Sequence, residues 1–531
     1  MRRRTGTLLA GVVAAGLVLA GCGGTDTEDR QDAGAPAGFA NGFVVEPADA
    51  GDPTTGGQLE MVTYSEARVL DPVQTIANGS SGGTEMAAVY DLLMRFDQEQ
   101  GAYVPQLAEA LEANDAQDEW TLTLREGVTF SDGSPLDADA VVWSLDRYVE
   151  KGGGQSSFLT HAVRRWSAVD ERTVRFELTE PWADFAYLLS TGPGMVVGKG
   201  SDKGGTFTTP IGAGPYVLER YTPQEELVLT AREDYWGGTP PLEAVRFFPI
   251  SAESGRLDVL RNGEADVAYL REAPTALEAL EEGFGGFMEI GSISRGLLLN
   301  HRDGAATADV RIRQAIVHAL DVDVINQRTA EGKGLVSTGI LNDLSQWDLE
   351  TEPLAHDVER ARALVEEAKA DGFDGTISFK GVAKVSEAMG VTLQGLLSDI
   401  GLEVSLDYVP SVTDLVNDIY VTRDFDMVIW SFGMPDQAVY PELYEKVHSS
   451  ARGNSGGSAD PELDGLIEEL GLATTPEEQQ EVLERIQAQW NETVPYAPLG
   501  ATPEWNAWGD DVHGVVPSID SIMLLGQAWK A

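Results

Sequence analysis

The second half of the chain alternates strand-like and helix-like segments, and this alternation limits the fold more than any other feature. In order, these segments are a strand at Ile377 and Phe379, a helix at about 386–400, a strand at Val404 and Leu406, a helix at about 412–420, and a strand from Phe425 to Trp430. Strands separated by single helices predict a parallel sheet with right-handed crossovers.

Other segments add helices around this sheet and antiparallel strands before it. Asp309 is placed to cap a helix with an apolar face, a second helix is expected from Asp357 to Lys369, and a last one near 477–490. In the first half, a first strand is expected around Leu59, and the alternating runs at Trp120–Leu124 and Val174–Leu178 are typical of antiparallel strands. The fold class predicted is therefore α/β with at least two lobes.

The N-terminus has the pattern of a secretory signal peptide. Arg2, Arg3 and Arg4 precede an apolar run, from Leu8 to Ala20, that is shorter than the roughly 20 residues needed to span a bilayer. The sequence Leu19-Ala20-Gly21-Cys22 resembles the bacterial lipobox, which implies cleavage after residue 21 and lipid attachment at Cys22. The alternative is an ordinary signal peptide with an incidental cysteine. Cys22 is the only cysteine, so no disulfide can form within the chain.

The segment that follows, residues 22–56, is rich in small and polar residues. It has few large apolar side chains with which to offset the entropy lost on ordering. We therefore expect a flexible tether between the lipid and the folded part.

The chain is strongly acidic, with 86 acidic and 37 basic residues and a net charge of −49. Without Arg2, Arg3 and Arg4 the net charge is −52, from 86 acids and 34 bases. This composition argues against nucleic-acid partners, because phosphate binding requires a basic surface. The charge fits adaptation to salt or attraction of cationic cargo, but the favoured interpretation is a repulsive surface that keeps the protein monomeric.

The search for catalytic chemistry finds one weak motif. Residues Gly79-Ser80-Ser81-Gly82-Gly83 match the G-x-S-x-G pattern of hydrolases, but a polar loop precedes them where that motif requires a buried strand. The six histidines show neither triad context nor metal spacing, and no nucleotide-binding motif is present. We therefore expect no enzyme activity, no cofactor and no metal.

Four stretches, in order along the chain, resemble the motifs of one transport family. They are Tyr90-Asp91-Leu92-Leu93, the run from Leu124 to Leu145, Ile211-Gly212-Ala213-Gly214-Pro215-Tyr216, and Asp309 to Asp321 with its Arg311-Ile312-Arg313-Gln314-Ala315-Ile316 core. Over about residues 58–531 the chain is similar to the family 5 extracytoplasmic solute-binding proteins, which bind peptides, opines or nickel chelates. Most motif residues have a structural explanation as turns and helix starts, so we expect them to be scaffold.

The resemblance implies a two-lobed fold like that of periplasmic binding proteins, with an extra domain inserted in the first lobe. The expected parts are a signal peptide (1–21), a tether (22–56), a first-lobe core (57–86, 195–292 and 500–531), an inserted domain (87–194) and a second lobe (293–499). Such a protein captures a small solute by hinged closure and delivers it to the permease subunits of an ABC importer. The implied location is the outer face of the bacterial cell membrane.

The resemblance also implies ligand contacts, with an oligopeptide as the first candidate. On the first lobe these are Asn78, Gly79 and Ser80, in the loop after Leu70-Asp71-Pro72. On the second lobe they are Trp430 and Phe432 as apolar walls, Gly433, Asp436 as partner of the peptide ammonium, Asn454 and Tyr496. Asp436 is alternatively an exposed turn residue.

Two other functions stay open at this point. The same fold could bind an oligosaccharide or a metal chelate, and the tryptophans Trp143, Trp182, Trp236, Trp430, Trp490, Trp505 and Trp508 leave a sugar platform possible. The other function is that of a surface hydrolase or receptor built on this fold.

Overall fold

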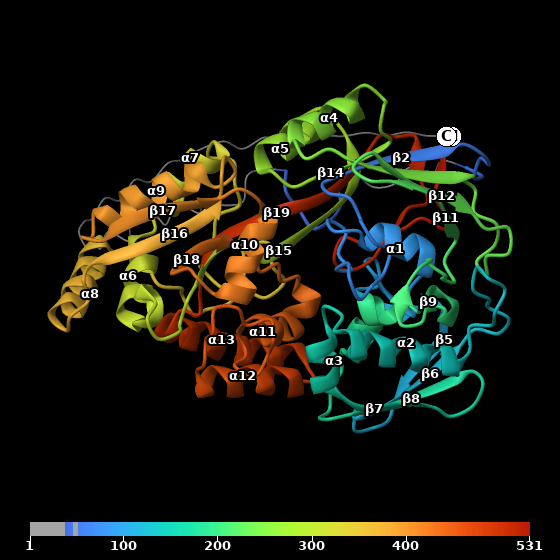
Figure 1. Cartoon of the computed structure of the whole chain (residues 1–531), viewed down its shortest axis with the longest axis horizontal. Coiled ribbons are helices and arrows are strands. Elements are labelled where there is room, and N and C mark those ends of the chain that lie inside the picture. The colour runs from blue at the N-terminus through green and yellow to red at the C-terminus, as the bar shows by residue number, and fades with distance from the viewer. Residues whose placement is uncertain (1–37, 46–50) are drawn as a thin grey trace, which may run out of the picture. The chain divides into compact units, whose positions relative to one another are not determined.

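An eleven-stranded mixed sheet runs through the computed structural model, which describes residues 38–45 and 51–531 (Figure 1). The order is β11-β12-β13-β2-β14-β19-β15-β18-β16-β17, and β1 pairs with β15. The strands are β1 (Gly42–Phe43), β2 (Gln58–Thr63), β11 (Tyr216–Thr222), β12 (Glu226–Ala231), β13 (Ala244–Pro249), β14 (Val267–Leu270), β15 (Gly285–Leu299), β16 (Thr376–Val382), β17 (Glu403–Val409), β18 (Met427–Trp430) and β19 (Tyr496–Trp508).

The two long strands β15 and β19 join two groups of strands. The first part of β15 pairs with the last part of β19, which pairs on its other side with β14. The last part of β15 pairs with β18. The chain passes from the first group to the second through β15 and returns through β19. These two strands are therefore the connection about which two lobes would hinge.

The second group of strands confirms the predicted parallel sheet. β16 pairs in parallel with both β17 and β18. Its helices are α6 (Val310–Ala319), α7 (Val322–Ala330), α8 (Val358–Ala370), α9 (Glu387–Ser398) and α10 (Val412–Asn417). Two start where the sequence predicts, because the side chains of Asp309 and Asp357 accept hydrogen bonds from the first-turn amides of Arg311 and Arg360.

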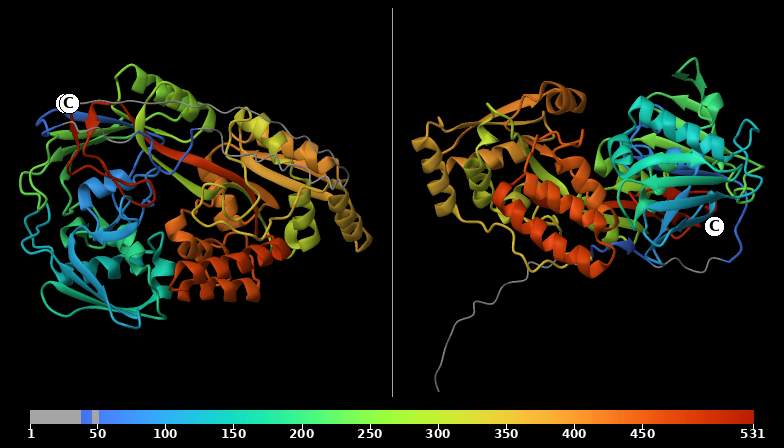
Figure 2. Two further views of the ribbon diagram at one scale, coloured as in Figure 1. Left: turned by 180° about the vertical axis from the view of Figure 1, so that it is seen from behind. Right: turned by 90° about the horizontal axis from the view of Figure 1, so that it is seen from below.

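Three further helices stand beside this group: α11 (Val439–Val447), α12 (Pro461–Leu472) and α13 (Pro476–Thr493). α12 lies against both α11 and α13, as both views of Figure 2 show. α13 begins with a capping box formed by Thr475 and Glu478, and it buries Val482, Leu483, Ile486 and Trp490, the apolar face expected from the sequence.

A separate four-stranded sheet contains the two runs that the sequence predicts to be antiparallel. Its order is β5-β6-β8-β7, and Trp120 pairs with Phe176 across β6 and β8. The elements between residues 94 and 190, which include this sheet and the separate pair β3–β4, are β3 (Met94–Asp97), β4 (Ala102–Pro105), β5 (Ala108–Ala113), β6 (Glu119–Leu124), α2 (Ala138–Lys151), α3 (Ser156–Ala162), β7 (Val163–Ala168), β8 (Thr173–Leu178) and η1 (Phe185–Ser190).

The remaining elements cover the first group of strands. They are α1 (Gly83–Tyr90), β9 (Asp202–Lys203), β10 (Thr206–Phe207), α4 (Glu253–Arg261), α5 (Ala273–Glu281), β20 (Val512–His513), β21 (Val516–Pro517), β22 (Met523–Leu524) and β23 (Trp529–Lys530). Short 3-10 turns complete the described chain: η2 (Gly192–Gly194), η3 (Lys199–Ser201), η4 (Ala306–Ala308) and η6 (Asp436–Ala438), with one turn of π-helix, η5 (Asp418–Thr422).

The motif residues are scaffold, as expected. A Cβ on Gly212 would lie 2.1 Å from the carbonyl oxygen of Val89, and one on Gly214 would lie 2.6 Å from that of Ala88, so only glycine permits this approach to α1. In α6, the buried Arg313 donates to the carbonyl oxygens of Thr307, Ala308 and Thr493. Neither motif faces a ligand site through these atoms.

The predicted flexible tether, 22–56, needs a correction in its described part. Phe39 is buried, Phe43 packs edge-on against Phe287, and β1 adds antiparallel to β15. Asn41 accepts a hydrogen bond from the amide of Ile290. Composition misled the prediction because two phenylalanines suffice to anchor a short strand when a sheet edge is free. The predicted domain boundaries stay predictions.

Candidate ligand-binding cleft

The middle of one face of the β15–β19 pair carries polar side chains, between the core residues Phe287 and Trp508 at one end and Tyr496 at the other. Ala497, Leu499 and Trp505 of β19 pack into the hydrophobic core. Side chains alternate along a strand, so Tyr496, Thr502 and Glu504 lie on the opposite face. This face is the floor of the candidate cleft.

Segments far apart in the sequence meet on this floor. The loop 518–522 lies over it, because the amide and hydroxyl of Ser521 both donate to Glu289 Oε2, at 2.5 and 3.0 Å. Asp520 and Ser521 both have left-handed backbone angles, with φ of 59° and 55°. Two consecutive non-glycine residues in this region are strained, which indicates a loop held in place by its surroundings.

The predicted first-lobe residues lie against this loop. The amide of Gly79 donates to the carbonyl of Asp520 at 2.8 Å, and a Cβ on Gly79 would lie 2.1 Å from the carbonyl oxygen of Ser521. Asn78 Oδ1 accepts hydrogen bonds from the amide and hydroxyl of Ser80, at 2.8 and 2.6 Å. The structure therefore brings Asn78, Gly79 and Ser80 to the cleft floor as one tight turn.

Three predicted second-lobe residues also come together. The Tyr496 hydroxyl donates to the carbonyl oxygen of Trp430 at 2.8 Å, and the ring of Phe432 lies 5.6 Å from that of Tyr496. Phe432 is buried, and Trp430 and Gly433 are partly exposed. Gly433 has a positive φ of 58°, which turns the chain sharply after Phe432. These residues form an aromatic corner beside the end of β18.

Asp436 is half-buried and not an exposed turn residue. Its two carboxylate oxygens accept hydrogen bonds from the Ser345 hydroxyl at 2.6 Å and from the Gln346 amide at 2.7 Å. It borders a cavity of about 260 Å³ between β1 and the loop after β18, which Glu289 also lines. Both of its oxygens therefore already serve a loop of the protein.

Asn454 has a similar internal use. Its Nδ2 donates to the carbonyl oxygens of Val447, His448 and Ser458, and its Oδ1 accepts from the amides of Gly457 and Ser458. A ligand contact by this side chain would have to displace one of these bonds. The sequence signal at Asn454 reflects the turn that it holds.

Several charged residues at the cleft were missed by sequence reasoning. Glu289 and Glu504 face each other directly across β15 and β19. Burial, and then the Glu504 carboxylate, raise the pKa of Glu289 to about 7. Burial raises the pKa of Asp520 well above its usual range, and Glu289 and Glu442 add to the rise.

Helix α11 contributes a carboxylate and an amine to the same space. Burial raises the pKa of Glu442 to about 7, and Lys446 lies 4.0 Å from its carboxylate. Burial alone would lower the pKa of Lys446, but Glu442, Tyr420 and Asp520 together raise it. The amine therefore stays charged among these acids.

Two arginines lie close by, one directly after β14 and one within β15. Arg271 follows β14, is within electrostatic range of Glu504, and has its guanidinium 5.6 Å from the centre of the Tyr64 ring. Arg295 lies in β15 between two register shifts, and burial lowers its pKa. Neither guanidinium takes part in an ion pair or side-chain hydrogen bond among the described residues, so both are available to an anionic group.

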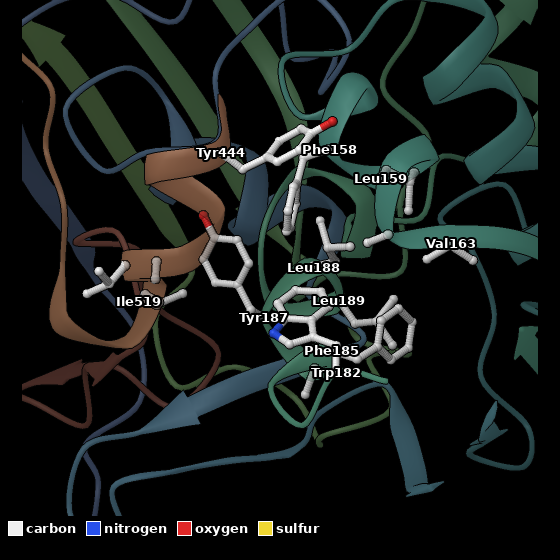
Figure 3. Packing of buried hydrophobic residues seen from close by; sticks show 14 of the residues in the cluster. Phe158, Leu159, Val163, Trp182, Phe185, Tyr187, Leu188, Leu189, Tyr444 and Ile519 are labelled. Atoms are coloured by element: carbon white, nitrogen blue, oxygen red, sulfur yellow. The ribbon is translucent and has the colours of Figure 1, made fainter. Parts of the chain in front are cut away.

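Helices α3 and α11 make a second contact, in which Phe158 packs beside Tyr444 (Figure 3). The amide of Phe158 in α3 donates to Glu445 Oε1 in α11 at 2.7 Å, and its ring lies 5.3 Å from that of Tyr440. The rings of His161 and Tyr444 stack at 4.0 Å. Because α3 precedes β15 and α11 follows it, this contact joins the two groups of elements a second time.

The family assignment rests on the profile of the bacterial extracellular solute-binding proteins, family 5 middle, which matches residues 102–454. This span is most of the folded chain. The chain belongs to this family. The two-lobed architecture of periplasmic binding proteins follows, with β15 and β19 as the strands between the lobes.

The chain also resembles a curated relative in sequence and solved structures in fold. The chain is 25% identical over 431 residues to the "Probable D,D-dipeptide-binding periplasmic protein" of Escherichia coli K12, covering 78% of this chain and 82% of that protein. The dipeptide binding protein of Pseudoalteromonas sp. SM9913, solved with Met-Leu, matches with a TM-score of 0.76 at 21% identity, over 90% of this chain and all of that chain. A Brucella suis protein solved with Fe(III)-EDTA matches with a TM-score of 0.73 at 23% identity, over 90% and 100%.

The described residues hold neither a cluster of metal ligands nor a membrane-spanning helix. No group of three or more His, Cys, Asp or Glu side chains there could hold a metal ion. No helix in residues 38–45 and 51–531 is long and apolar enough to cross a membrane. Cys22 lies outside the described residues.

Proposed function

We propose that this family 5 protein captures a peptide between its two lobes and delivers it to the permease of an ABC importer. The observation that carries the proposal is the convergence of the 78–80 turn, the 518–522 loop and the Trp430–Tyr496 corner on one face of β15 and β19. The relatives named for dipeptide binding support a peptide as cargo.

The charges of the cleft suit a ligand with groups of both signs. A peptide brings an ammonium and a carboxylate, and closure would remove both from water, so each must meet an opposite charge. Carboxylates gather around Glu289 and Asp520, while the unpaired Arg271 and Arg295 offer anion partners. Trp430 and Tyr496 would supply apolar contact for side chains.

Hinged closure is the proposed mechanism. Peptide binding would stabilise the closed arrangement, because contacts to both lobes exist only there. The permease would then recognise the closed form. Asp436 and Asn454 would act on the shape of the cleft through the loops that they hold.

The proposal is tested by native mass spectrometry of the mature protein purified from cells. We expect bound peptides of a narrow length range, released on denaturation. Recovery of a sugar or a metal chelate would instead favour the other cargo classes. Of the tryptophans that could stack on a sugar, Trp182, Trp490, Trp505 and Trp508 are buried, which disfavours a carbohydrate platform.

We further infer that the protein acts without catalysis. The Ser80 hydroxyl lies 2.6 Å from Asn78 Oδ1 and 3.4 Å from the Ser81 hydroxyl, and no histidine is among their partners in the described chain. A surface hydrolase on this fold would need a base at this serine. Peptides incubated with the mature protein should therefore remain intact, and turnover abolished by Ser81→Ala would overturn this inference.

We also propose that the protein is held as a monomer at the outer face of the cell membrane by lipid on Cys22. The lipobox-like sequence before Cys22 supports the proposal. Cys22→Ser should move the protein from the membrane fraction to the soluble fraction of expressing cells. Unchanged fractionation would contradict it.

A further inference from the structure

Two carboxylates face each other across the hinge strands without a matched cation. In the register of β15 and β19, Glu289 pairs with Glu504. Side chains directly opposite on antiparallel strands have Cβ atoms about 4.5–5.5 Å apart, and like charges in this position destabilise a sheet. Such an arrangement in the floor of a cleft requires a compensating feature.

The protein itself compensates the pair only in part. Glu289 Oε2 accepts two hydrogen bonds from Ser521, and Asp520 brings a third carboxylate within electrostatic range of both glutamates. Lys446 and Arg271 are within electrostatic range of Asp520 and Glu504, respectively. None of these three carboxylates forms an ion pair among the described residues.

Two buried hydroxyls on the same face also lack partners. Thr502 pairs with Gly291, two residues from the Glu289–Glu504 pair, and Tyr269 pairs with Asn506, two residues from Glu504. Tyr269 is 3% exposed and Thr502 is 8% exposed. Neither hydroxyl stands in hydrogen-bonding geometry with another described residue, although Tyr269 lies close to the side chains of Glu504 and Ser80.

Unpartnered buried hydroxyls are rare because each has given up its hydrogen bonds to water without a replacement. A ligand group that donates several hydrogen bonds and carries positive charge would relieve both the carboxylate repulsion and the need for partners. An ammonium or guanidinium group has these properties. A metal ion does not fit, since the described residues offer no group of three metal ligands.

We propose that Glu289, Glu504 and Asp520 form a subsite for a cationic nitrogen group of the cargo, with the Tyr269 and Thr502 hydroxyls beside it. The cation is either the peptide α-ammonium or a basic side chain. This inference rests on the proposed peptide-binding function and names the chemistry of its cargo.

Binding of a cation in the subsite should change the number of protons bound to the protein. The pKa of Glu289, raised to about 7 without ligand, should fall when a cation binds, because the ionised form then gains a partner. Binding therefore releases protons near neutral pH. Affinity for a cationic peptide should rise with pH between 5.5 and 7.5.

The test is calorimetric titration of the cargo-free mature protein with four probes: Ala-Ala, Lys-Ala, N-acetyl-Ala-Ala and N-acetyl-Lys-Ala. We expect the two probes without the decisive cation to bind at least tenfold more weakly. If both acetylated peptides bind weakly, the group bound in the subsite is the α-ammonium. If N-acetyl-Lys-Ala binds tightly and Ala-Ala binds weakly, the group bound in the subsite is the basic side chain.

Glu504→Gln, and independently Glu289→Gln, should reduce the affinity for the tightest cationic probe at least tenfold. Their thermal midpoints should stay unchanged or rise, because the substitution removes repulsion. Glu281→Gln, at an exposed position in α5, is the matched control and should bind like the unaltered protein.

If all four probes bind alike and both variants bind normally, the subsite is overturned while peptide binding stands. If the unaltered protein binds no peptide, the proposed function fails and the subsite with it.

Discussion

Arg147, two residues after the family-like run from Leu124 to Leu145, shows how a single residue acts on the fold. Its guanidinium binds Asp71 through two hydrogen bonds of 2.9 and 2.8 Å and also binds Asp202 at 2.8 Å. The side chains of Arg147 and Asp71 are 6% and 2% exposed. The Leu70-Asp71-Pro72 stretch is thus tied to α2, which fixes the start of the loop that carries Asn78.

Asp71→Asn should destabilise the protein by about 3–5 kcal/mol, because it leaves a buried arginine without its full partner. Urea denaturation monitored by tryptophan fluorescence measures the change. The control is Glu177→Gln, which breaks an exposed pair with Arg164 and should cost less than about 1 kcal/mol. Equal effects of the two substitutions would contradict the structural role of Asp71.

Glu85 in α1 gives a pH-dependent prediction at the same scale. It is buried, its Oε2 has no hydrogen-bond partner among the described residues, and burial raises its pKa from 4.5 to about 7. The folded state therefore keeps a proton that the unfolded state releases, so Glu85 lowers stability as pH rises from about 4.5 to 7. Glu85→Gln should gain up to about 3 kcal/mol at pH 8 and almost nothing at pH 4. Equal gains at both pH values in urea denaturation would contradict this.

At the scale of elements, helices α3, α11 and α12 form a contact between the two groups of elements through ionisable side chains. Glu468 of α12 lies 3.4 Å from His161 Nε2 of α3 and 3.3 Å from His448 Nε2, just after α11. These histidines lower the pKa of Glu468 to about 2. The stability that the ionised Glu468 contributes is therefore lost as pH falls from about 4.5 toward 2.

Glu468→Gln should weaken the closed form, because it removes the charge that joins His161 to the second lobe. We expect faster dissociation of a bound peptide, measured by stopped-flow fluorescence at pH 6. Glu469→Gln is the matched control, since Glu469 pairs with Arg485 within the second lobe. If both variants release the peptide at the same rate, the contact between α3 and α12 does not stabilise the closed form.

The strands and helices of the second lobe were predictable because local patterns determine them. Asp309 and Asp357 cap helices where they were expected, and the β16–β18 region is parallel as predicted. β1 was not predictable, since its stability comes from the free edge of β15 and not from its own composition.

The candidate cleft was predictable only where a loop has a distinctive composition. The Gly79 turn and the Trp430–Phe432 segment met such a criterion, and the structure places them at the cleft. Glu289, Glu504 and Asp520 did not, because they are three among 86 acids and converge only through strand register. An acidic residue within a largely buried strand, as at Glu289 and Glu504, was the one available signal.

At the scale of the whole molecule, the net charge of −49 acts on stability. Like charges repel one another most strongly in the compact state, and salt screens this repulsion. The thermal midpoint of the mature protein should therefore rise when sodium chloride is increased from 10 to 500 mM at pH 7. A midpoint that is unchanged or lower in high salt, measured by differential scanning fluorimetry, would show that the acidic surface carries no such cost.

The central claim is that a peptide is held between both lobes on the face of β15 and β19. Hydrogen–deuterium exchange of the cargo-free mature protein, with and without a saturating peptide, tests it most directly. We expect amides of residues 78–80 and 518–522 in the first lobe and of residues 430–433 in the second to become protected together. Protection in one lobe only, or in neither, would contradict capture by closure.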